Sequence, residues 1–146
     1  MITLSKPIIS EEEKQAVMRV LDSGMIAQGP EVAAFEHEFS LFMEGHRCIA
    51  VNSGTSALHL GLLASGIECG DEVIIPSFTF AATANAVALC GATPVFVDIN
   101  IETFTMDPKA AEAAITENTS AIMPVHLYGH PSNMDPFTEI CSRKGL

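Results

Sequence analysis

The fold is decided by residues 51–108, VNSGTSALHLGLLASGIECGDEVIIPSFTFAATANAVALCGATPVFVDINIETFTMDP. Short apolar runs alternate here with helical stretches rich in small residues, a texture typical of a parallel sheet with crossover helices. The sequence predicts four strands, at Cys48–Val51, Glu72–Ile75, Thr93–Val97 and Ala121–Val125. The helices predicted after them are Thr55–Ser65, Thr79–Leu89, Pro108–Ile115 and Met134–Lys144. We therefore expect an α/β fold.

Two amphipathic helices are expected before the first strand. Ser10 and Glu13 form a capping-box pattern, apolar residues follow at helical spacing, and Gly24 ends the helix. After a loop over Met25–Pro30, apolar residues again recur at helical spacing, namely Val32, Phe35, Phe39 and Phe42. We expect residues 1–45 to form these helices and residues 46–146 to form the strand–helix units, within one folded domain.

Composition argues against several classes of partner. The chain has 18 acidic and 7 basic residues, and its net charge of −11 leaves no attraction for nucleic acid or an anionic membrane. Its cysteines follow no metal-ligand or C-x-x-C spacing, so we expect no metal site and buried, reduced thiols. These are Cys48, Cys69, Cys90 and Cys141. The N-terminus lacks a secretory pattern and no apolar run reaches the roughly 18 residues of a membrane span, so a cytoplasmic protein is expected.

Candidate site residues cluster where the predicted strands end. In an open parallel sheet, ligands bind outside the carboxyl ends of the strands, where loops and helix N-termini converge. Four segments lie there: Asn52–Ser56, Pro76–Phe80, Asp98–Ile101 and His126–Gly129. They contain most of the polar and aromatic residues that flank the apolar runs, so we expect a site at this edge.

The first of these segments is suited to a phosphate. Gly54 allows close backbone approach, while Thr55 and Ser56 add hydroxyl groups beside free helix N–H groups. A plain turn capped by Ser53 or Thr55 explains the same residues equally well. The segment matches neither the dinucleotide nor the P-loop glycine pattern, so the phosphate would belong to another kind of ligand.

The other segments carry aromatic and imidazole side chains. Phe80 is the candidate to lie flat on a planar cofactor, although filling the core between helix and sheet is the commoner role for such a residue. His126 and Tyr128 follow the fourth strand, where a hydrogen-bonded structural histidine is commoner than a catalytic one. Asp98 most simply caps the turn that follows it.

Four motifs in this order, SGTSAL, PSFTF, FVDI and PVHLYG, make the sequence resemble the DegT/StrS sugar aminotransferases. The resemblance covers almost the whole chain and corresponds to the N-terminal part of their large domain. It implies a three-layer sandwich with a mostly parallel sheet, the large domain of fold-type-I pyridoxal phosphate enzymes, here truncated. By this resemblance Gly54, Thr55 and Ser56 hold the cofactor phosphate, Phe80 stacks on the pyridine ring, and Gly29 lies in a loop near the active site and dimer interface.

The resemblance also implies an activity. Such enzymes use pyridoxal 5′-phosphate to move an amino group from an amino acid, in our expectation glutamate, to a keto-sugar nucleotide in polysaccharide or amino-sugar biosynthesis, and they form homodimers. The lysine that binds the cofactor belongs to a later segment, so we assign no catalytic residue to this chain. The chain ends after a helix and Gly145, where a strand should follow, so we expect a part of a longer protein that is inactive alone.

Three other interpretations stay open. A non-catalytic relative would use the same residues for sensing or assembly. A member of the family with histidine at the lysine position would dehydrate sugars. An unrelated Rossmann-like domain fits the strand–helix pattern, but the absence of its glycine fingerprint counts against it.

Overall fold

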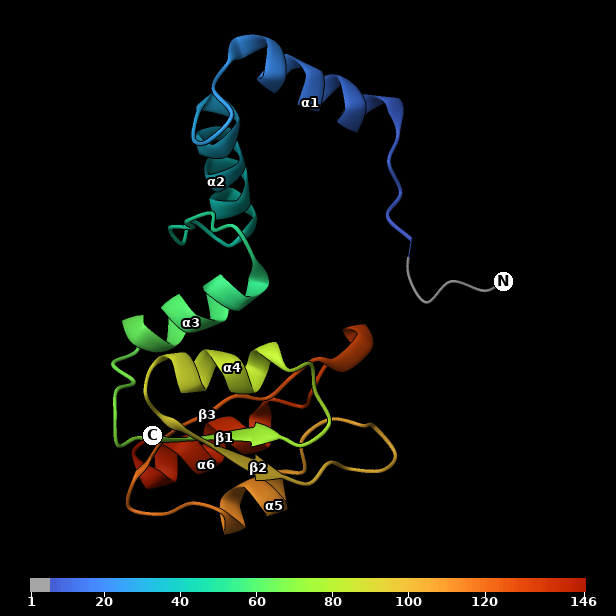
Figure 1. Ribbon diagram of the computed structural model, residues 1–146. Helices are drawn as coiled ribbons and strands as arrows, with labels where there is room; N and C mark the ends of the chain where they lie inside the picture. The colour runs from blue at the N-terminus through green and yellow to red at the C-terminus, as the bar shows by residue number, and fades with distance from the viewer. Residues whose placement is uncertain (1–5) are drawn as a thin grey trace. The chain divides into compact units, whose positions relative to one another are not determined.

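The computed structural model describes residues 6–146 of the chain. The chain divides into two compact units, the first ending at Ala50 and the second covering Val51–Leu146 (Figure 1). None of the helices in residues 6–146 is long and apolar enough to cross a membrane.

The first unit contains the two predicted helices. Helix α1 spans Glu11–Ser23; Ser10 caps its N-terminus in the predicted capping box, and Gly24 ends it with a φ of 71°, a left-handed conformation that suits glycine. Helix α2 spans Pro30–Phe42. Pro30 therefore does not belong to the preceding loop but is the first helical residue, where its missing N–H costs nothing.

The second unit is a parallel sheet with helices on both faces. Its elements in chain order are α3 (Gly54–Ala64), β1 (Glu72–Pro76), α4 (Ala82–Leu89), β2 (Thr93–Val97), α5 (Pro108–Ala113), β3 (Thr119–Ile122), the 3-10 turn η1 (Leu127–Gly129) and α6 (Asp135–Lys144). The strands lie in the order β2-β1-β3 and all pairs are parallel. Figure 1 shows α3 and α4 on one face of this sheet and α5 and α6 on the other. The predicted three-layer α/β fold is confirmed.

The central strand β1 joins two hydrophobic clusters. Val73 and Ile75 point to one face and pack with residues of α3 and α4, namely Leu62, Ala86 and Val87. Ile74, between them, points to the other face and packs with Met106, Ala111 and Phe137. All three β1 side chains are fully buried. This is the alternation that a strand covered on both faces produces.

Two strand predictions need correction. Residues 48–51 form no strand, and none of the strands in residues 6–146 pairs with them. An apolar run becomes a strand only when another strand supplies its hydrogen bonds, and the run itself does not reveal such a partner. The last strand is Thr119–Ile122, not residues 121–125. Pro124 has no N–H to donate, so the pairing with β1 stops just before it.

Helix α4 and the cysteines also differ from expectation. Helix α4 begins at Ala82, three residues after the predicted start, because residues 77–81 are needed to turn the chain from β1 back over the sheet. The cysteines are free, as expected, but none is buried: Cys69 is exposed and the other three are half-buried. Cysteine burial depends on which face of its element is covered, and isolated cysteines carry no periodic pattern that shows this.

Asp71, the residue before β1, links this strand to Ser120 of β3 through its side chain. Its carboxylate accepts hydrogen bonds from the Ser120 hydroxyl at 2.6 Å and from the Glu68 N–H at 2.8 Å. These bonds, with that of Ser120 the stronger cause, lower the pKa of Asp71 below its ordinary value of 3.8. A carboxyl whose pKa is lower in the folded than in the unfolded chain stabilises the folded state at pH values above the unfolded-state pKa. This stabilisation is lost as the pH falls through the folded-state pKa.

Asp71→Asn should therefore lower the free energy of unfolding at neutral pH and make that free energy depend less on pH in the acid range. Asparagine cannot accept from both donors as a charged carboxylate does, and it does not titrate. Urea unfolding at pH 7 and at steps below pH 4 measures both effects. The two proteins should converge in stability as the pH falls below 3.8, the ordinary value for the carboxyl. A constant difference between them across this range would show that Asp71 acts through its shape alone.

Candidate functional site

The predicted site segments of the second unit lie at one end of it. Helices α3 and α4 pack against each other and begin at the same end, the end to which the carboxyl terminus of β1 points (Figure 1). The first turn of α3 holds Gly54, Thr55 and Ser56, and Phe80 lies between β1 and α4. The structure therefore brings these four predicted residues to the same edge of the sheet.

The turn that starts α3, residues 53–56, leaves two backbone donors free. Ser53 caps the helix: its hydroxyl accepts from the Ser56 N–H at 3.1 Å, and its carbonyl accepts from the Ala57 N–H at 3.0 Å. Among the described residues, nothing accepts from the N–H groups of Gly54 and Thr55. Free donors at a helix N-terminus attract anions, because the helix dipole adds partial positive charge there.

Gly54 keeps the approach to these donors open. A Cβ placed on Gly54 would have no atom within 4 Å, so the space above this backbone is empty. The Ser56 hydroxyl donates to the Asn52 side-chain oxygen at 2.7 Å, which fixes Asn52 against the turn. The capped turn and the phosphate site, the two interpretations of this segment, are thus compatible. Ser53 caps the turn, and the N–H groups of Gly54 and Thr55 remain available to an anion.

Phe80 does not fill the core. Its side chain is 75% exposed. Its carbonyl accepts from the Thr83 N–H at 3.0 Å, which holds the backbone of Phe80 at the entrance of α4. Phe78, two residues earlier, is 44% exposed and meets Phe104 with 6.2 Å between ring centroids. An exposed ring beside a helix N-terminus is free to contact a planar ligand.

His126 and Tyr128 follow β3 at the same edge. The Nδ1 atom of His126 accepts from the Ser132 N–H at 2.9 Å, so the neutral ring carries its proton on Nε2 and can donate from there. Tyr128 is 93% exposed and has a φ of 53°, unusual for a bulky residue. Sequence reasoning found neither Ser132 as the partner of His126 nor Phe104 as the partner of Phe78. No local pattern marks either contact.

Asp98 and Gly29 have mainly local roles in the structure. The Asp98 carboxylate accepts from the Ile99 N–H at 2.8 Å, the capping bond predicted for it. Gly29 lies in the first unit as the N-cap of α2, in extended backbone. A Cβ on Gly29 would lie 3.2 Å from the Met25 Cβ, a tight contact that a side chain there could make only if Met25 moved slightly.

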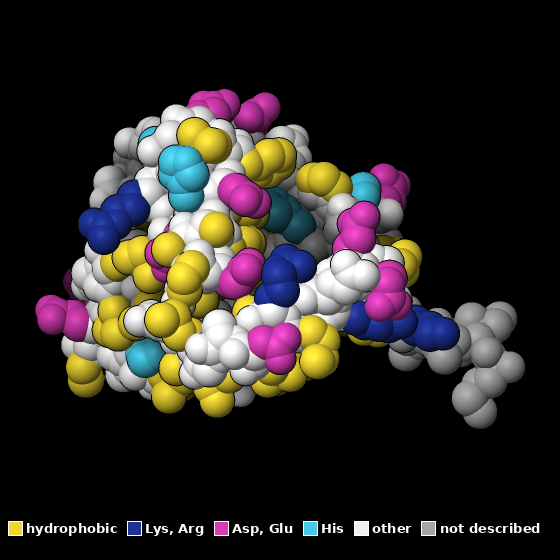
Figure 2. Space-filling view, turned by 90° about the horizontal axis from the view of Figure 1, so that it is seen from above, with side chains coloured by type: hydrophobic (Ala, Val, Ile, Leu, Met, Phe, Trp, Pro, Cys, Tyr) yellow, Lys and Arg dark blue, Asp and Glu magenta, His cyan; other side chains and the backbone are white. Residues whose placement is uncertain are grey.

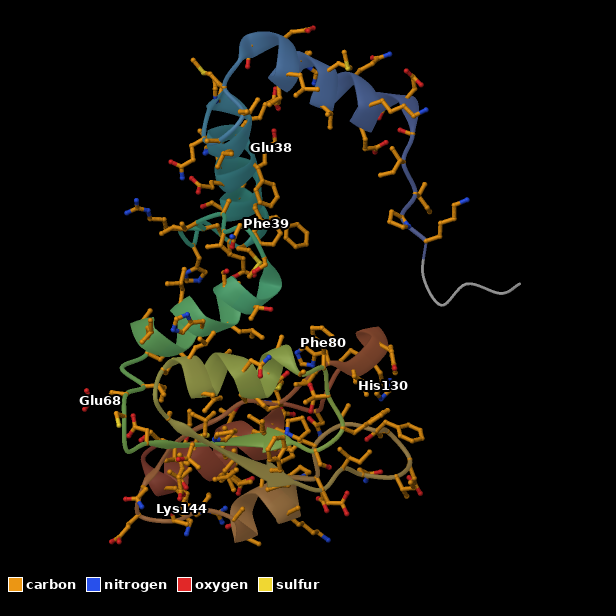
Figure 3. All side chains as sticks on the ribbon, viewed as in Figure 1. Glu38, Phe39, Glu68, Phe80, His130 and Lys144 are labelled. Atoms are coloured by element: carbon orange, nitrogen blue, oxygen red, sulfur yellow. The ribbon has the colours of Figure 1, made fainter. Side chains whose placement is uncertain are left out.

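One lysine of the second unit lies at the opposite end from this edge. Lys14 is on α1, where it pairs with Glu11 at 3.3 Å, and Lys109 is on α5. Lys144 ends α6, and Figure 3 shows it at the opposite end of the second unit from Phe80. The edge that carries the free N–H groups offers backbone donors and aromatic rings.

Comparison with known proteins identifies the family. The model of the DegT/DnrJ/EryC1/StrS aminotransferase family matches residues 7–146. The chain belongs to this family.

Two curated relatives show the range of the family. The erythromycin biosynthesis sensory transduction protein EryC1 of Saccharopolyspora erythraea is 52% identical over 132 residues, which cover 90% of this chain and 36% of that protein. The dTDP-3-amino-3,4,6-trideoxy-alpha-D-glucose transaminase of Streptomyces venezuelae is 49% identical over 135 residues, which cover 92% of this chain and 36% of the relative. This chain thus spans about a third of the length of the relatives it matches.

A solved structure similar to this chain contains pyridoxamine phosphate (PMP), the amino form of pyridoxal phosphate. NtdA from Bacillus subtilis, with bound PMP, matches with a TM-score of 0.88 and 42% identity, over 94% of this chain and 33% of NtdA. The residues at the edge of the sheet fit such a cofactor. The free N–H groups of Gly54 and Thr55, with open space above Gly54, suit a phosphate, and the exposed ring of Phe80 suits a pyridine ring.

Proposed function

We propose that this chain supplies the cofactor-binding part of a pyridoxal-phosphate aminotransferase. The whole enzyme would move an amino group from an amino acid, glutamate in our proposal, to a keto-sugar nucleotide in polysaccharide or amino-sugar biosynthesis. One observation carries the proposal: two free N–H groups and an open glycine at the start of α3 share an edge with an exposed aromatic ring. The family to which the chain belongs supports the reaction type.

Each residue has a distinct role in this proposal. The N–H groups of Gly54 and Thr55 donate to phosphate oxygens, and the Thr55 hydroxyl adds a further donor. Ser56 holds the turn through its bonds to Ser53 and Asn52. Phe80 covers one face of the cofactor ring and excludes water from it. When bound, pyridoxal phosphate supplies an electron sink for removing a proton next to the amino group.

The substrate side of the site is assigned to the residues after β3. His126, held by Ser132, presents an Nε2 proton that can donate to a carbonyl or carboxylate oxygen. Tyr128 offers a phenol and an exposed ring at the same edge. No catalytic residue is assigned within these 146 residues; the lysine that carries the cofactor belongs, in this proposal, to another part of the protein.

The proposed assembly is a homodimer in the cytoplasm, with Gly29 in the loop at the subunit interface. The row of exposed rings on α2 supports a partner surface in the first unit. The exposed fractions are 55% for Phe35, 44% for Phe39 and 79% for Phe42. The ring centroids of Phe35 and Phe39 lie 5.7 Å apart, and those of Phe39 and Phe42 lie 6.1 Å apart. Exposed apolar rows of this kind mark interaction surfaces in soluble proteins.

A second candidate function is sensing without catalysis. The relative EryC1, at 52% identity, bears the name of a sensory transduction protein. In that case the residues at the edge of the sheet would bind the cofactor or a sugar ligand without turning it over. Turnover by an enzyme built with this chain separates the two candidates.

A chimera tests the proposed function. In the Streptomyces venezuelae transaminase, the segment that matches this chain over 135 residues is replaced by the residues of this chain. We expect the chimera to bind PMP and retain transaminase activity, and Phe80→Ala to weaken PMP binding roughly tenfold by removing the stacked ring. Phe96→Ala, on β2 and 57% exposed, is the matched control and should leave binding unchanged.

Two results would count against the aminotransferase proposal. A folded chimera that binds PMP but has no transaminase activity would favour the sensing function. A folded chimera that binds no PMP, or in which Phe80→Ala has no more effect than Phe96→Ala, would show that the cofactor does not contact this edge of the sheet.

A further inference from the structure

Segments that follow the three strands of the sheet meet in a pocket of about 430 Å³. Phe78 comes after β1, Phe104 after β2, and Tyr128 after β3, and all three line the pocket. Since parallel strands end at a common edge, this pocket lies at the edge that carries Phe80. Figure 3 shows Phe80 and His130, another residue of the pocket lining, at the same end of the second unit.

The aromatic rings of the pocket are available to a ligand. Phe78 is 44% exposed, Phe104 is 50% exposed and Tyr128 is 93% exposed. Phe78 and Phe104 are tilted by 58° with 6.2 Å between their centroids, so the two rings do not stack face to face on each other. Exposed aromatic rings stack well on planar heterocycles, which are attracted to them whatever their substituents.

Two of these aromatic residues hold an unfavourable backbone conformation. Phe104 has a φ of 58° and Tyr128 a φ of 53°, in the left-handed region that bulky residues rarely adopt. Such conformations persist where the surrounding structure enforces them, and they concentrate at ligand-binding segments. Both strained residues contribute to one pocket. Glycine or asparagine would adopt these backbone angles with less strain.

Charge selects the part of a ligand that fits here. Glu102 lines the pocket, and the described residues of the lining include neither lysine nor arginine. The Glu102 carboxylate would repel a phosphate group of the ligand. It would accept a hydrogen bond strongly from an N–H group of the ligand. Uracil, thymine and guanine each carry a ring N–H beside a carbonyl group, and adenine and cytosine do not.

We propose that this pocket binds the base of a nucleotide-linked sugar, a uracil, thymine or guanine ring stacked on Tyr128 and donating its ring N–H to Glu102. The inference rests on the proposed function, which makes the acceptor a sugar nucleotide. It assigns the base to residues 78, 102–104 and 127–130, apart from the phosphate-binding turn at the start of α3. Binding of the base alone requires neither the cofactor nor a lysine, so it is testable separately.

Nucleosides are the probes, because they lack phosphates and so report on the base pocket alone. Saturation-transfer NMR observes uridine and guanosine in the presence of the 146-residue chain without cofactor. We expect uridine to bind at least about fivefold more tightly than 3-methyluridine, which stacks equally but has no ring N–H. Guanosine and 1-methylguanosine should differ in the same way. Glu102→Leu, which leaves no acceptor for the ring N–H, should remove most of both differences.

A backbone-matched pair of variants tests the stacking. Tyr128→Asn removes the ring and places a residue that tolerates the left-handed region, so thermal stability should hold or rise while uridine affinity falls at least about fivefold. Glu44→Asn is the control: Glu44 has a φ of 55° and belongs to the first unit, so the same backbone relief occurs in the unit that does not contain the pocket. It should leave uridine binding unchanged.

Several outcomes would overturn the inference. It fails if no nucleoside binds, if the methylated nucleosides bind as well as the parents, or if Tyr128→Asn binds uridine like the unmodified chain. The comparison of methylated and parent nucleosides uses the unmodified chain, so it stands even if a variant misfolds. An active chimera with no nucleoside binding overturns this inference alone, whereas an inactive chimera with uridine bound as expected overturns the proposed function alone.

Discussion

Ile75→Ala should destabilise the second unit by about 2–5 kcal/mol, the range for truncating a buried isoleucine. Ile75 is fully buried in the central strand and packs in the cluster shared with α3 and α4. The loss combines the apolar surface returned to water with the cavity left among side chains that cannot fully collapse. Against a typical total stability of about 5–15 kcal/mol, this is a large fraction. Because β1 leads directly to residues 77–80, the site should lose its order with it.

Urea unfolding followed by circular dichroism measures this effect. Ile101→Ala is the matched control, because Ile101 is 78% exposed and its truncation should change stability by no more than about 0.5 kcal/mol. Ile75→Val removes a single methylene group and should fall between them, at about 0.5–1.5 kcal/mol. If Ile75→Ala and Ile101→Ala were equally destabilised, β1 would not be the buried centre of the sheet.

Local signals in the sequence predicted the helices well. The Ser10 cap, the Gly24 stop and the helix start at Pro108 depend on residues one to three positions away, and the structure contains each of them. Strand β2 matches its predicted bounds, Thr93–Val97, since an apolar run between turn residues marks it on both sides. The order of strands and helices then fixed the edge at which the candidate residues meet.

Contacts between distant segments could not be predicted in this way. Whether residues 48–51 form a strand depends on a neighbour that the run itself does not specify. The bond from Ser132 to His126 depends on the turn between them, which requires a positive φ at Tyr128. Phe104 reaches Phe78 only because two parallel strands bring their following loops together. Such information lies in the tertiary fold and not in any local pattern.

Thr55→Asp should abolish the tighter binding of PMP than of pyridoxamine that we expect of the unmodified chain. The carboxylate would stand beside the free N–H groups of Gly54 and Thr55, where its charge repels a phosphate. The fold should survive, because an acidic residue in the first turn of a helix favours the helix dipole. Thr55→Asn has a similar size and no charge, so it is the matched control, and we expect its affinity for PMP to stay within about tenfold of the unmodified chain.

Equilibrium dialysis of PMP and of pyridoxamine, which lacks the phosphate, tests the central claim that the start of α3 holds the cofactor phosphate. The unmodified chain and Thr55→Asn should bind PMP more tightly than pyridoxamine, whereas Thr55→Asp should bind PMP at least about 100-fold more weakly than the unmodified chain. Equal binding of PMP and pyridoxamine by the unmodified chain, or unchanged PMP binding by a folded Thr55→Asp variant, would contradict the claim.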